Sequence, residues 1–361
     1  MRDSAPSIAR VALTSVNSIY TLDPLVDQRW NDLVAHHGEA SAFHQRGWLE
    51  ALSRTYGYQP LVLTSSPPGR PLDNGIVLCR VSSWITGTRL VSLPFSDHCD
   101  ALLDDISGYH EFIDWLRGEC DRQQYKYVEL RPLFRCQEMC GLQPSHSYCF
   151  HELDIRPTLE HLFRGLQKDS IQRKIRRAER EQLSYEAGRS EQLMDDFFRL
   201  FVITRRRHQL PPPPRVWFRN LLECMGDNIE VRVARKNGYP IGAVLTLRHR
   251  SAVMYKYGCS DDRFHNLGAM PFLIWRLIEE SKASKVEKID FGRSDSDNEG
   301  LIGFKDRFGT TRRLLTYYRH PTTKKEHKAS NRSLQAIRQL LSFVPDSILA
   351  RAGKVLYRHI G

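Results

Sequence analysis

The sequence predicts an α/β protein of two domains, each built on a mixed, mostly antiparallel sheet that is flanked by helices. Size and composition are the first observation: 361 residues with 41% hydrophobic and 10% aromatic content can bury two cores. The second is the order of local patterns, because helical and strand segments follow one another in a similar way in two halves, 15–142 and 150–320. We therefore expect two globular domains.

The elements of the first half are expected to be short and separated by turns. Helices are predicted over 27–36, 45–56 and 108–123, and strands over 60–64, 75–82 and 125–131.

The second half is expected to open with helices over 159–182, 190–208 and 214–225. The last of these follows a run of four prolines, which cannot continue a helix. Strands over 229–235 and 241–248 flank Asn237-Gly238, a pair typical of a tight hairpin. A strand over 251–258, a helix over 271–282 and a strand near 288–292 follow, and we expect 304–309 in a loop.

Three segments result from these patterns: an N-terminal domain at 1–149, a C-terminal domain at 150–322 and a basic, amphipathic helical tail at 323–361. Apolar residues of the tail recur at helical spacing from 334 to 360, with Arg and Lys on the other face. Such a segment either packs on the body or lies on an anionic membrane surface.

Neither a membrane span nor a secretory signal is predicted. No run of 18 apolar residues occurs, and the first residues lack a basic segment followed by an apolar core. We therefore expect a cytoplasmic protein, with the inner membrane surface as a peripheral contact of the tail.

The eight cysteines are expected to be reduced thiols, because none is paired in a C-x-x-C spacing. Only Cys136 and Cys140, with His146 and His151 downstream, could suggest a metal site, and zinc sites usually have tighter, duplicated spacing. We expect no metal.

Positive charge is concentrated rather than spread evenly. The net charge is +11, and much of the excess lies in Lys168–Arg180, in Arg205–His208 and in the tail. A basic helix is usually a solvated face, and the functional alternative is an anionic partner: nucleotide phosphates, a tRNA acceptor stem or an acidic lipid head group.

The most informative segment runs from Tyr255 to Gly309. An aromatic strand ends in Gly-Cys-Ser, and Gly268-Ala269 then opens a helix whose free N–H groups could hold a phosphate or carbonyl oxygen. An ordinary helix start is the structural alternative.

The continuation of this segment reads KIDFGR at 288–293, NEGL at 298–301 and FKDRFG at 304–309. This order resembles the C-terminal half of the Fem-type peptidyltransferases and their acetyltransferase relatives on the GNAT fold. The segments LQKDSIQRKIRRAER at 166–180 and FVITRRRHQLP at 201–211 are also similar to that family, whereas the N-terminal part matches only in outline. The resemblance implies tandem GNAT-like domains.

The resemblance also implies an N-acyltransferase. It would move an acyl or aminoacyl group from acyl-CoA, acyl carrier protein or aminoacyl-tRNA to an amine of a bacterial cell-envelope precursor, for peptidoglycan or exopolysaccharide, or of a lipid. We expect direct attack, because no Ser-His-Asp order and no G-x-S-x-G segment occurs. No tightly bound cofactor is expected. The Fem enzymes that use tRNA often carry a coiled-coil arm, and none is visible, which favours a thioester.

Site residues follow from the matched positions and from the local patterns. Lys305 would balance a phosphate or oxyanion charge, and Asp290 and Arg293 flank the strand end; these three are the candidate catalytic residues. Two of them have a structural alternative: Lys305 as a surface lysine in a loop, and Asp290 as a partner in a structural hydrogen bond with the loop 300–304. The candidate substrate-binding residues are Tyr255, Tyr257, His208, Arg205, Arg173, Arg176, Arg177, Phe304 and Arg307. The candidate donor-binding loop comprises Ser260, Gly268 and Ala269.

A nonenzymatic module that binds nucleic acid or another anionic ligand on a relic GNAT fold is the alternative. Its weakness is that the aromatic residues are not interleaved with the basic ones, as single-strand binders require.

Overall fold

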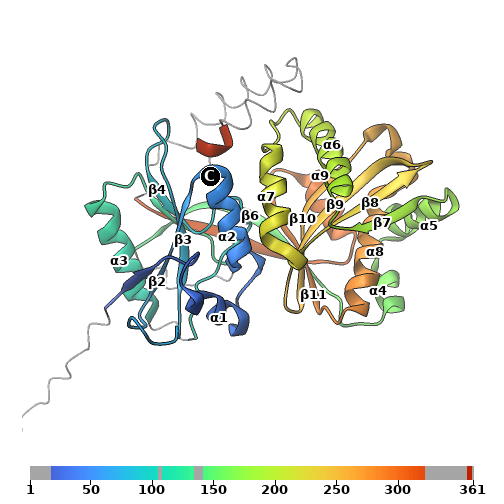
Figure 1. The fold of residues 1–361 in the computed structure, drawn as a ribbon. Helices are drawn as coiled ribbons and strands as arrows, with labels where there is room; N and C mark the ends of the chain where they lie inside the picture. The colour runs from blue at the N-terminus through green and yellow to red at the C-terminus, as the bar shows by residue number, and fades with distance from the viewer. Residues whose placement is uncertain (1–17, 105–107, 134–140, 322–355, 360–361) are drawn as a thin grey trace, which may run out of the picture.

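A computed structural model describes residues 18–104, 108–133, 141–321 and 356–359. Its strands form one continuous twelve-stranded sheet (Figure 1). The strand order is β1-β2-β3-β4-β5-β12-β6-β11-β10-β9-β8-β7. The sheet is mostly antiparallel, and helices cover it. The predicted fold class is confirmed.

The first half contains β1 (Tyr20–Leu22), α1 (Gln28–His36), a 3-10 turn (Ala42–His44), α2 (Arg46–Tyr56), β2 (Gln59–Thr64), β3 (Ile76–Val81), β4 (Arg89–Val91), α3 (Tyr109–Arg122) and β5 (Val128–Leu130). Its helices begin and end within two residues of their predicted limits. The sequence patterns missed the short strands β1 and β4.

β6 (Gln143–Asp154) follows as the sixth strand of the first half. The second half contains α4 (Leu159–Gly165), a π-helical turn (Lys168–Gln172), α5 (Arg173–Arg180), β7 (Ser184–Gly188), α6 (Glu191–Arg207), α7 (Arg215–Met225), a 3-10 turn (Gly226–Asn228), β8 (Ile229–Lys236), β9 (Tyr239–His249), β10 (Ala252–Ser260), a 3-10 segment (Asp262–Leu267), α8 (Ala269–Ala283), β11 (Lys288–Asp295), α9 (Glu299–Asp306) and β12 (Thr311–His320).

Two element predictions were wrong. The single helix over 159–182 is interrupted, because Leu166 has an extended conformation at the end of α4 and a π-helical turn precedes α5. The supposed loop at 304–309 contains the end of α9, a helix that Asn298 caps by accepting a hydrogen bond from the N–H of Leu301. This places Lys305 inside a helix and buries it.

The two halves repeat one pairing pattern. In each, three antiparallel pairs are followed by one parallel pair, β4 with β5 and β10 with β11. The sixth strand of each half has crossed over, since β6 pairs with β11 and β12 pairs with β5. Because β6 and β12 also pair with each other, the halves meet in a shared sheet. β6 runs through the predicted boundary at 149/150, which remains a prediction.

The described end of the tail packs on the body. Tyr357 and His359 are buried in a short helical turn, and the hydroxyl of Tyr58 donates to the carbonyl of Tyr357. The rest of the predicted tail, 323–355 and 360–361, lies outside the described residues. In the described part of the chain, no helix combines the length and apolarity that a membrane crossing needs.

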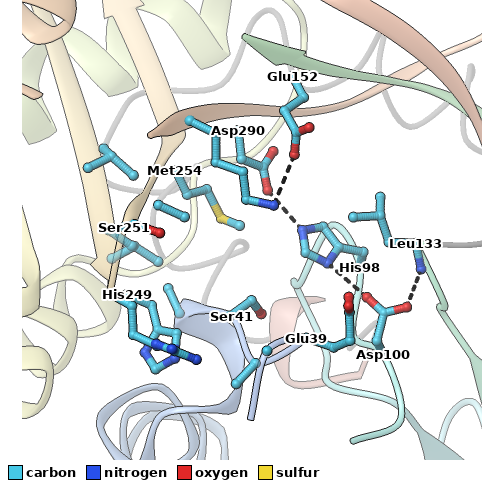
Figure 2. Close-up of a pocket in the computed structure, with 18 residues that line it drawn as sticks. Glu39, Ser41, His98, Asp100, Leu133, Glu152, His249, Ser251, Met254 and Asp290 are labelled. Carbon is cyan, nitrogen blue, oxygen red and sulfur yellow. Dashed lines mark hydrogen bonds and ion pairs between the residues drawn. The ribbon is translucent and has the colours of Figure 1, made fainter. Parts of the chain in front are cut away.

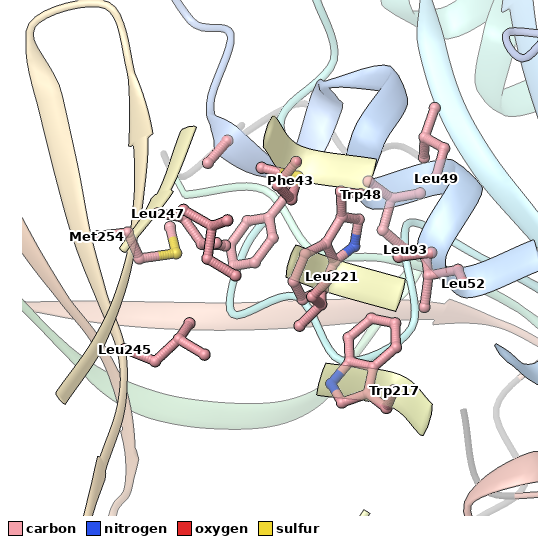
Figure 3. Close-up of a cluster of buried hydrophobic side chains, with 14 of the residues drawn as sticks. Phe43, Trp48, Leu49, Leu52, Leu93, Trp217, Leu221, Leu245, Leu247 and Met254 are labelled. Carbon is pink, nitrogen blue, oxygen red and sulfur yellow. The ribbon is translucent and has the colours of Figure 1, made fainter. Parts of the chain in front are cut away.

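The largest core crosses the boundary between the halves (Figure 3). Trp48 of α2 meets Trp217 of α7 edge to face, with ring centroids 5.2 Å apart. Figure 1 shows α2 and α7 side by side where the halves meet. Gly47 makes this approach possible, since a Cβ there would lie 2.4 Å from the carbonyl oxygen of Cys224.

We therefore expect Gly47→Ala to destabilise the protein by about 1–3 kcal/mol, because the added methyl group must push α2 away from α7. The matched control is Gly118→Ala in α3, where a Cβ meets nothing within 4 Å. That change should stabilise by about 0.5–1 kcal/mol, since alanine is the better helix former. Urea unfolding of both variants measures the difference. Equal effects of the two substitutions would contradict the packing argument.

Candidate functional site

A fork between β10 and β11 is the centre of the candidate site. The two strands pair in parallel only from Ala252 to Met254. β10 then continues along β9 as far as Ser260, with a bulge between Tyr255 and Tyr257. β11 in turn shifts its register against β6 between Asp290 and Arg293. The backbones thus diverge beyond Met254 and leave a wedge that other groups can enter.

A loop of the first half fills this wedge. Nζ of Lys256, on the bulge, donates to Oδ2 of Asp97 (3.0 Å) and to the carbonyl of Phe95 (2.8 Å). Arg293 lies 3.7 Å from Oδ1 of the same carboxylate. Gly292 has φ +67°, and a Cβ there would come within 2.9 Å of Oδ2 of Asp97. Glycine is therefore required at 292 for two reasons, its backbone conformation and the approach of this loop.

The three candidate catalytic residues lie together at the base of the fork. Lys305 is 3% exposed, and its Nζ donates to the carbonyls of Gly292 (3.1 Å) and Arg293 (3.0 Å). Oδ1 of Asp290 accepts the N–H of Gly292 (2.6 Å), and Oδ2 of Asp290 lies 2.8 Å from Nε2 of His98. These contacts replace the expected structural alternatives, since Lys305 is not on the surface and Asp290 forms hydrogen bonds with Gly292 and His98.

Burial and charge set the ionisation of this group. Burial lowers the pKa of Lys305 to about 8. The negative charges of Asp97 and Asp290 raise this pKa, and the positive charges of Lys256 and Arg293 lower it further. Burial also disfavours a charged His98, but Asp100 and Asp290 raise its pKa to about 10. Burial would raise the pKa of Asp97, and Lys256 and Arg293 outweigh it, so the pKa falls. The fork thus holds an ionised network with a weakly basic lysine.

A first cavity, of about 220 Å³, lies at the start of α8. The candidate residues that line it are Ser260, Gly268, Ala269, Phe304 and Arg307. Lys174 of α5 also lines it, and no side chain caps the first turn of α8. Gly268 has φ +80°, and a Cβ there would lie 2.5 Å from the carbonyl oxygen of Lys174. Its replacement would therefore disturb the contact between α5 and α8 as well as any ligand.

A second cavity, of about 200 Å³, lies between the halves at the other end of β10 (Figure 2). Asp290 and His98 point toward each other on its wall, and Glu152 pairs with Lys288 (3.3 Å). Oδ1 of Asp100 accepts the N–H of Leu133 (2.8 Å). Asp290 is therefore shared between the fork and this cavity.

The two candidate tyrosines flank Lys256 at the fork, but their rings pack against the hydrophobic cores. The ring of Tyr255 stacks on Phe291, and Tyr257 packs among Phe201 and Phe218. Burial raises the pKa of both tyrosines well above the usual range. Neither side chain is free to titrate near neutral pH.

The predicted basic residues occupy helix surfaces. Arg205 donates to the carbonyl of Pro211 and the hydroxyl of Tyr357, and His208 is exposed at the end of α6. Burial, Arg207 and Arg205 lower the pKa of His208. Of the α5 residues, Arg173 and Arg176 are exposed and Arg177 faces Glu181, whereas Lys174 reaches the first cavity.

Sequence reasoning missed the contribution of the first half to the site. Asp97, His98 and Asp100 come from the segment SDHCD, and Lys256 stands between the two tyrosines that were considered. A cluster of ionisable residues within five positions was the available signal. The partners of these residues could not be read from any local pattern.

No group of metal-ligating side chains occurs within the described residues. His146 stacks with Tyr148, and His151 lies 3.2 Å from Asp306, while Cys136 and Cys140 fall outside the described ranges. Every cysteine that the structure describes is a free thiol.

Comparison with known proteins bears on the fold and the second half. Residues 166–306 match the family described as an acetyltransferase (GNAT) domain. No curated protein matches the chain by sequence.

Several solved structures are similar over most of the chain. FemX aligns with a TM-score of 0.65 and 12% identity, covering 86% of this chain and 98% of its own. The C-terminal domain assigned to a lysylphosphatidylglycerol synthetase of Agrobacterium fabrum aligns with a TM-score of 0.53 and 15% identity. This alignment covers 87% of this chain and 95% of that domain. A tandem GNAT protein from the clavulanic acid biosynthesis pathway aligns with a TM-score of 0.52 and 11% identity, covering 85% of this chain and 99% of its own. At these identities the likeness establishes the fold.

The buried state of Lys305 predicts a pH-dependent stability. In the folded protein this lysine loses its proton near pH 8, whereas the ordinary value is 10.5. Between these values the unfolded chain binds one more proton, so the free energy of unfolding should rise by roughly 1 kcal/mol per pH unit. The free energy of unfolding of the wild type minus that of Lys305→Met, measured by urea unfolding from pH 7 to 10.5, isolates this contribution. Lys168→Met reports the effect of removing an exposed lysine. Parallel curves for wild type and Lys305→Met would contradict the assignment.

Proposed function

We propose that this chain, an acyltransferase with a GNAT domain over residues 166–306 and a Fem-like fold, transfers an acyl group from a thioester to an amine by direct attack. The observation that carries the proposal is the fork between β10 and β11, with a cavity at each end of β10 and a buried ionic cluster between them.

The first cavity suits the anionic part of the donor. Lys174 and Arg307 supply positive charge, and the uncapped first turn of α8 supplies N–H groups and the positive end of the helix dipole. Ser260 at this cavity and Met254 at the second are six residues apart on β10, or about 20 Å. A donor held at α8 therefore needs a long, thin arm to reach Asp290, and a pantetheine thioester of CoA or acyl carrier protein has one.

Aminoacyl-tRNA is the less supported donor. The longest helix in the described ranges is α6, with 17 residues, and these ranges hold no long helical hairpin of the kind that would grip a tRNA.

The ionic cluster would stabilise the transition state. When the amine nitrogen bonds to the carbonyl carbon, the carbonyl oxygen becomes negative; the C–S bond then breaks, and the proton of the amine leaves with the thiol. Three cations, Lys256, Arg293 and Lys305, stand against the carboxylates Asp97 and Asp290 at the fork. This excess of positive charge in a buried site favours the oxyanion. Asp290 would orient the amine.

For the acceptor, we propose an amine of a cell-envelope precursor, a polysaccharide sugar or a lipid. The fold similarity to FemX and to the lysylphosphatidylglycerol synthetase domain supports this class. A thioester donor would place the reaction in the cytoplasm, with the tail as a contact to the inner membrane if the acceptor is a lipid.

A donor panel tests the function. Acetyl-CoA, longer acyl-CoAs, acyl carrier proteins and aminoacyl-tRNAs are added in thermal-shift and thiol-release assays, because a ligand that binds only the folded state raises the melting temperature. We expect stabilisation and amine-dependent thiol release with a thioester. Binding of random oligonucleotides at physiological salt, with no transfer from any donor, would instead support the nonenzymatic alternative.

Lys174→Gln should raise KM for the donor about fivefold at low salt, with kcat nearly unchanged, because it removes one charge from the first cavity. Arg180→Gln is the matched control, since Arg180 is exposed on the same helix and does not line the cavity. The same loss in both variants would indicate a general surface field, and no loss in Lys174→Gln would remove this cavity from donor binding.

The charge of Lys305 predicts a pH profile for turnover. If the ammonium form is required, activity is lost as pH rises through about 8. Lys305→Arg keeps its charge at any accessible pH, so the ratio of wild-type to Lys305→Arg turnover should fall about tenfold per pH unit above 8. This ratio cancels the titration of the substrates. A ratio that does not change with pH would show that the charge of Lys305 plays no part in turnover.

A further inference from the structure

The cavity between the halves is built by both of them. The first half supplies the turn from Gly38 to Ala42 together with His98 and Asp100, and the second half supplies the beginnings of β10 and β11. Its volume of about 200 Å³ is smaller than the roughly 300–1,000 Å³ of sites for drug-sized ligands. It therefore fits a small molecule or one end of a larger one.

The charge on this cavity is opposite to that of the whole protein. Four carboxylates line it, and the facing cations are Lys288 and the imidazolium of His98; the carboxylates belong to Glu39, Asp100, Glu152 and Asp290. Arg250 also borders the cavity, but its guanidinium donates to the carbonyls of His36 and His37. With Arg250 counted, four negative and three positive groups leave a formal charge of −1 in a chain of +11.

One wall group has an unused hydrogen-bonding atom. His98 is 4% exposed, and its Nδ1 has no hydrogen-bond partner. The nearest carboxylate oxygen, Oδ2 of Asp100, is 3.7 Å away, which is too far for a hydrogen bond. The Nδ1–H of His98 therefore faces Asp100 without a hydrogen bond, and an acceptor oxygen of a ligand that moves Asp100 aside would satisfy it.

We propose that this cavity holds the acceptor, as a group that carries a primary ammonium together with a nearby hydroxyl or carbonyl oxygen, such as an amino sugar. The proposal rests on the transfer to an amine inferred above. The carboxylates select the ammonium, which releases one proton to solvent before its nitrogen attacks the thioester, and the oxygen accepts the N–H of His98. The position of the cavity also suits the reaction, because Asp290 on its wall is linked to Lys305 through Gly292. Asp290 accepts a hydrogen bond from the N–H of Gly292, and the carbonyl of Gly292 accepts one from Nζ of Lys305.

Titration calorimetry without any donor tests the binding site. Glucosamine is the probe, and glucose, which has a hydroxyl in place of the amine, is its neutral match. We expect glucosamine to bind at least tenfold more tightly than glucose, because only the amine brings a charge that meets the carboxylates. Equal binding of the two, or no binding of glucosamine, would overturn the proposal.

Three variants locate the binding. Glu39→Gln should weaken glucosamine binding about threefold, since Glu39 is exposed and its charge is partly screened. Ala252→Leu, which fills the cavity, should weaken it at least tenfold. Glu160→Gln, an exposed carboxylate on α4, should leave it unchanged. Wild-type affinity in both cavity variants would overturn the proposal, and Glu39→Gln keeps the test valid if Ala252→Leu fails to fold.

Failure of the site and failure of the function are distinguishable. Transfer to glucosamine with a KM that neither cavity variant changes would reject this cavity as the acceptor site and retain the acyltransferase. Glucosamine binding that the cavity variants weaken, with no transfer from any donor, would support the cavity as an amine site and reject the proposed reaction.

Discussion

The exchange of β6 and β12 between the two halves is the constraint on which the rest of the structure depends. Each half completes its sheet with the other's sixth strand, so the halves cannot separate without breaking three ladders, β5 with β12, β12 with β6 and β6 with β11. β12 follows directly on the helix that carries Lys305, and the hydroxyl of its Tyr317 donates to the carbonyl of Asp97 (2.6 Å). Both halves therefore build the fork: β12 joins the helix that carries Lys305 through the chain, and it contacts the loop of Asp97 through Tyr317.

The contact between the two halves lets the protein bury charged side chains that one half alone could not stabilise. Lys256 lies over the rings of Phe43 and Tyr257, at 5.0 and 5.4 Å, and pairs with Asp97 from the other half. Removing ions from water carries a large desolvation penalty, which is offset only by close pairing and further hydrogen bonds. Arg293 is held less completely, with Oδ1 of Asp97 at 3.7 Å on one side and the ring of Tyr148 at 4.1 Å on the other, and its buried Nη1 has no hydrogen-bond partner.

Local patterns predicted what local physics determines. The hairpin at Asn237-Gly238 forms as expected, because both residues adopt positive φ, and the helices of the first half end where predicted. The exchanged strands could not be foreseen, because their partners are set by the whole topology. The same holds for the site: His98 and Asp290 are 192 residues apart, and Asp97 and Lys256 are 159. The family motifs led to Lys305 and Asp290, yet nothing near them in sequence indicated that the first half completes the network.

The two cavities differ in charge in a way that suits two different substrates. Lys174 and Arg307 make the cavity at α8 positive, whereas the cavity between the halves is formally negative. Under the proposed reaction, a phosphate-bearing donor is attracted to the first and repelled by the second, and a cationic acceptor behaves in the opposite way. The ends of one strand would therefore sort the substrates before they meet at the fork. This sorting needs no moving part, because the shared sheet fixes the distance between the two cavities.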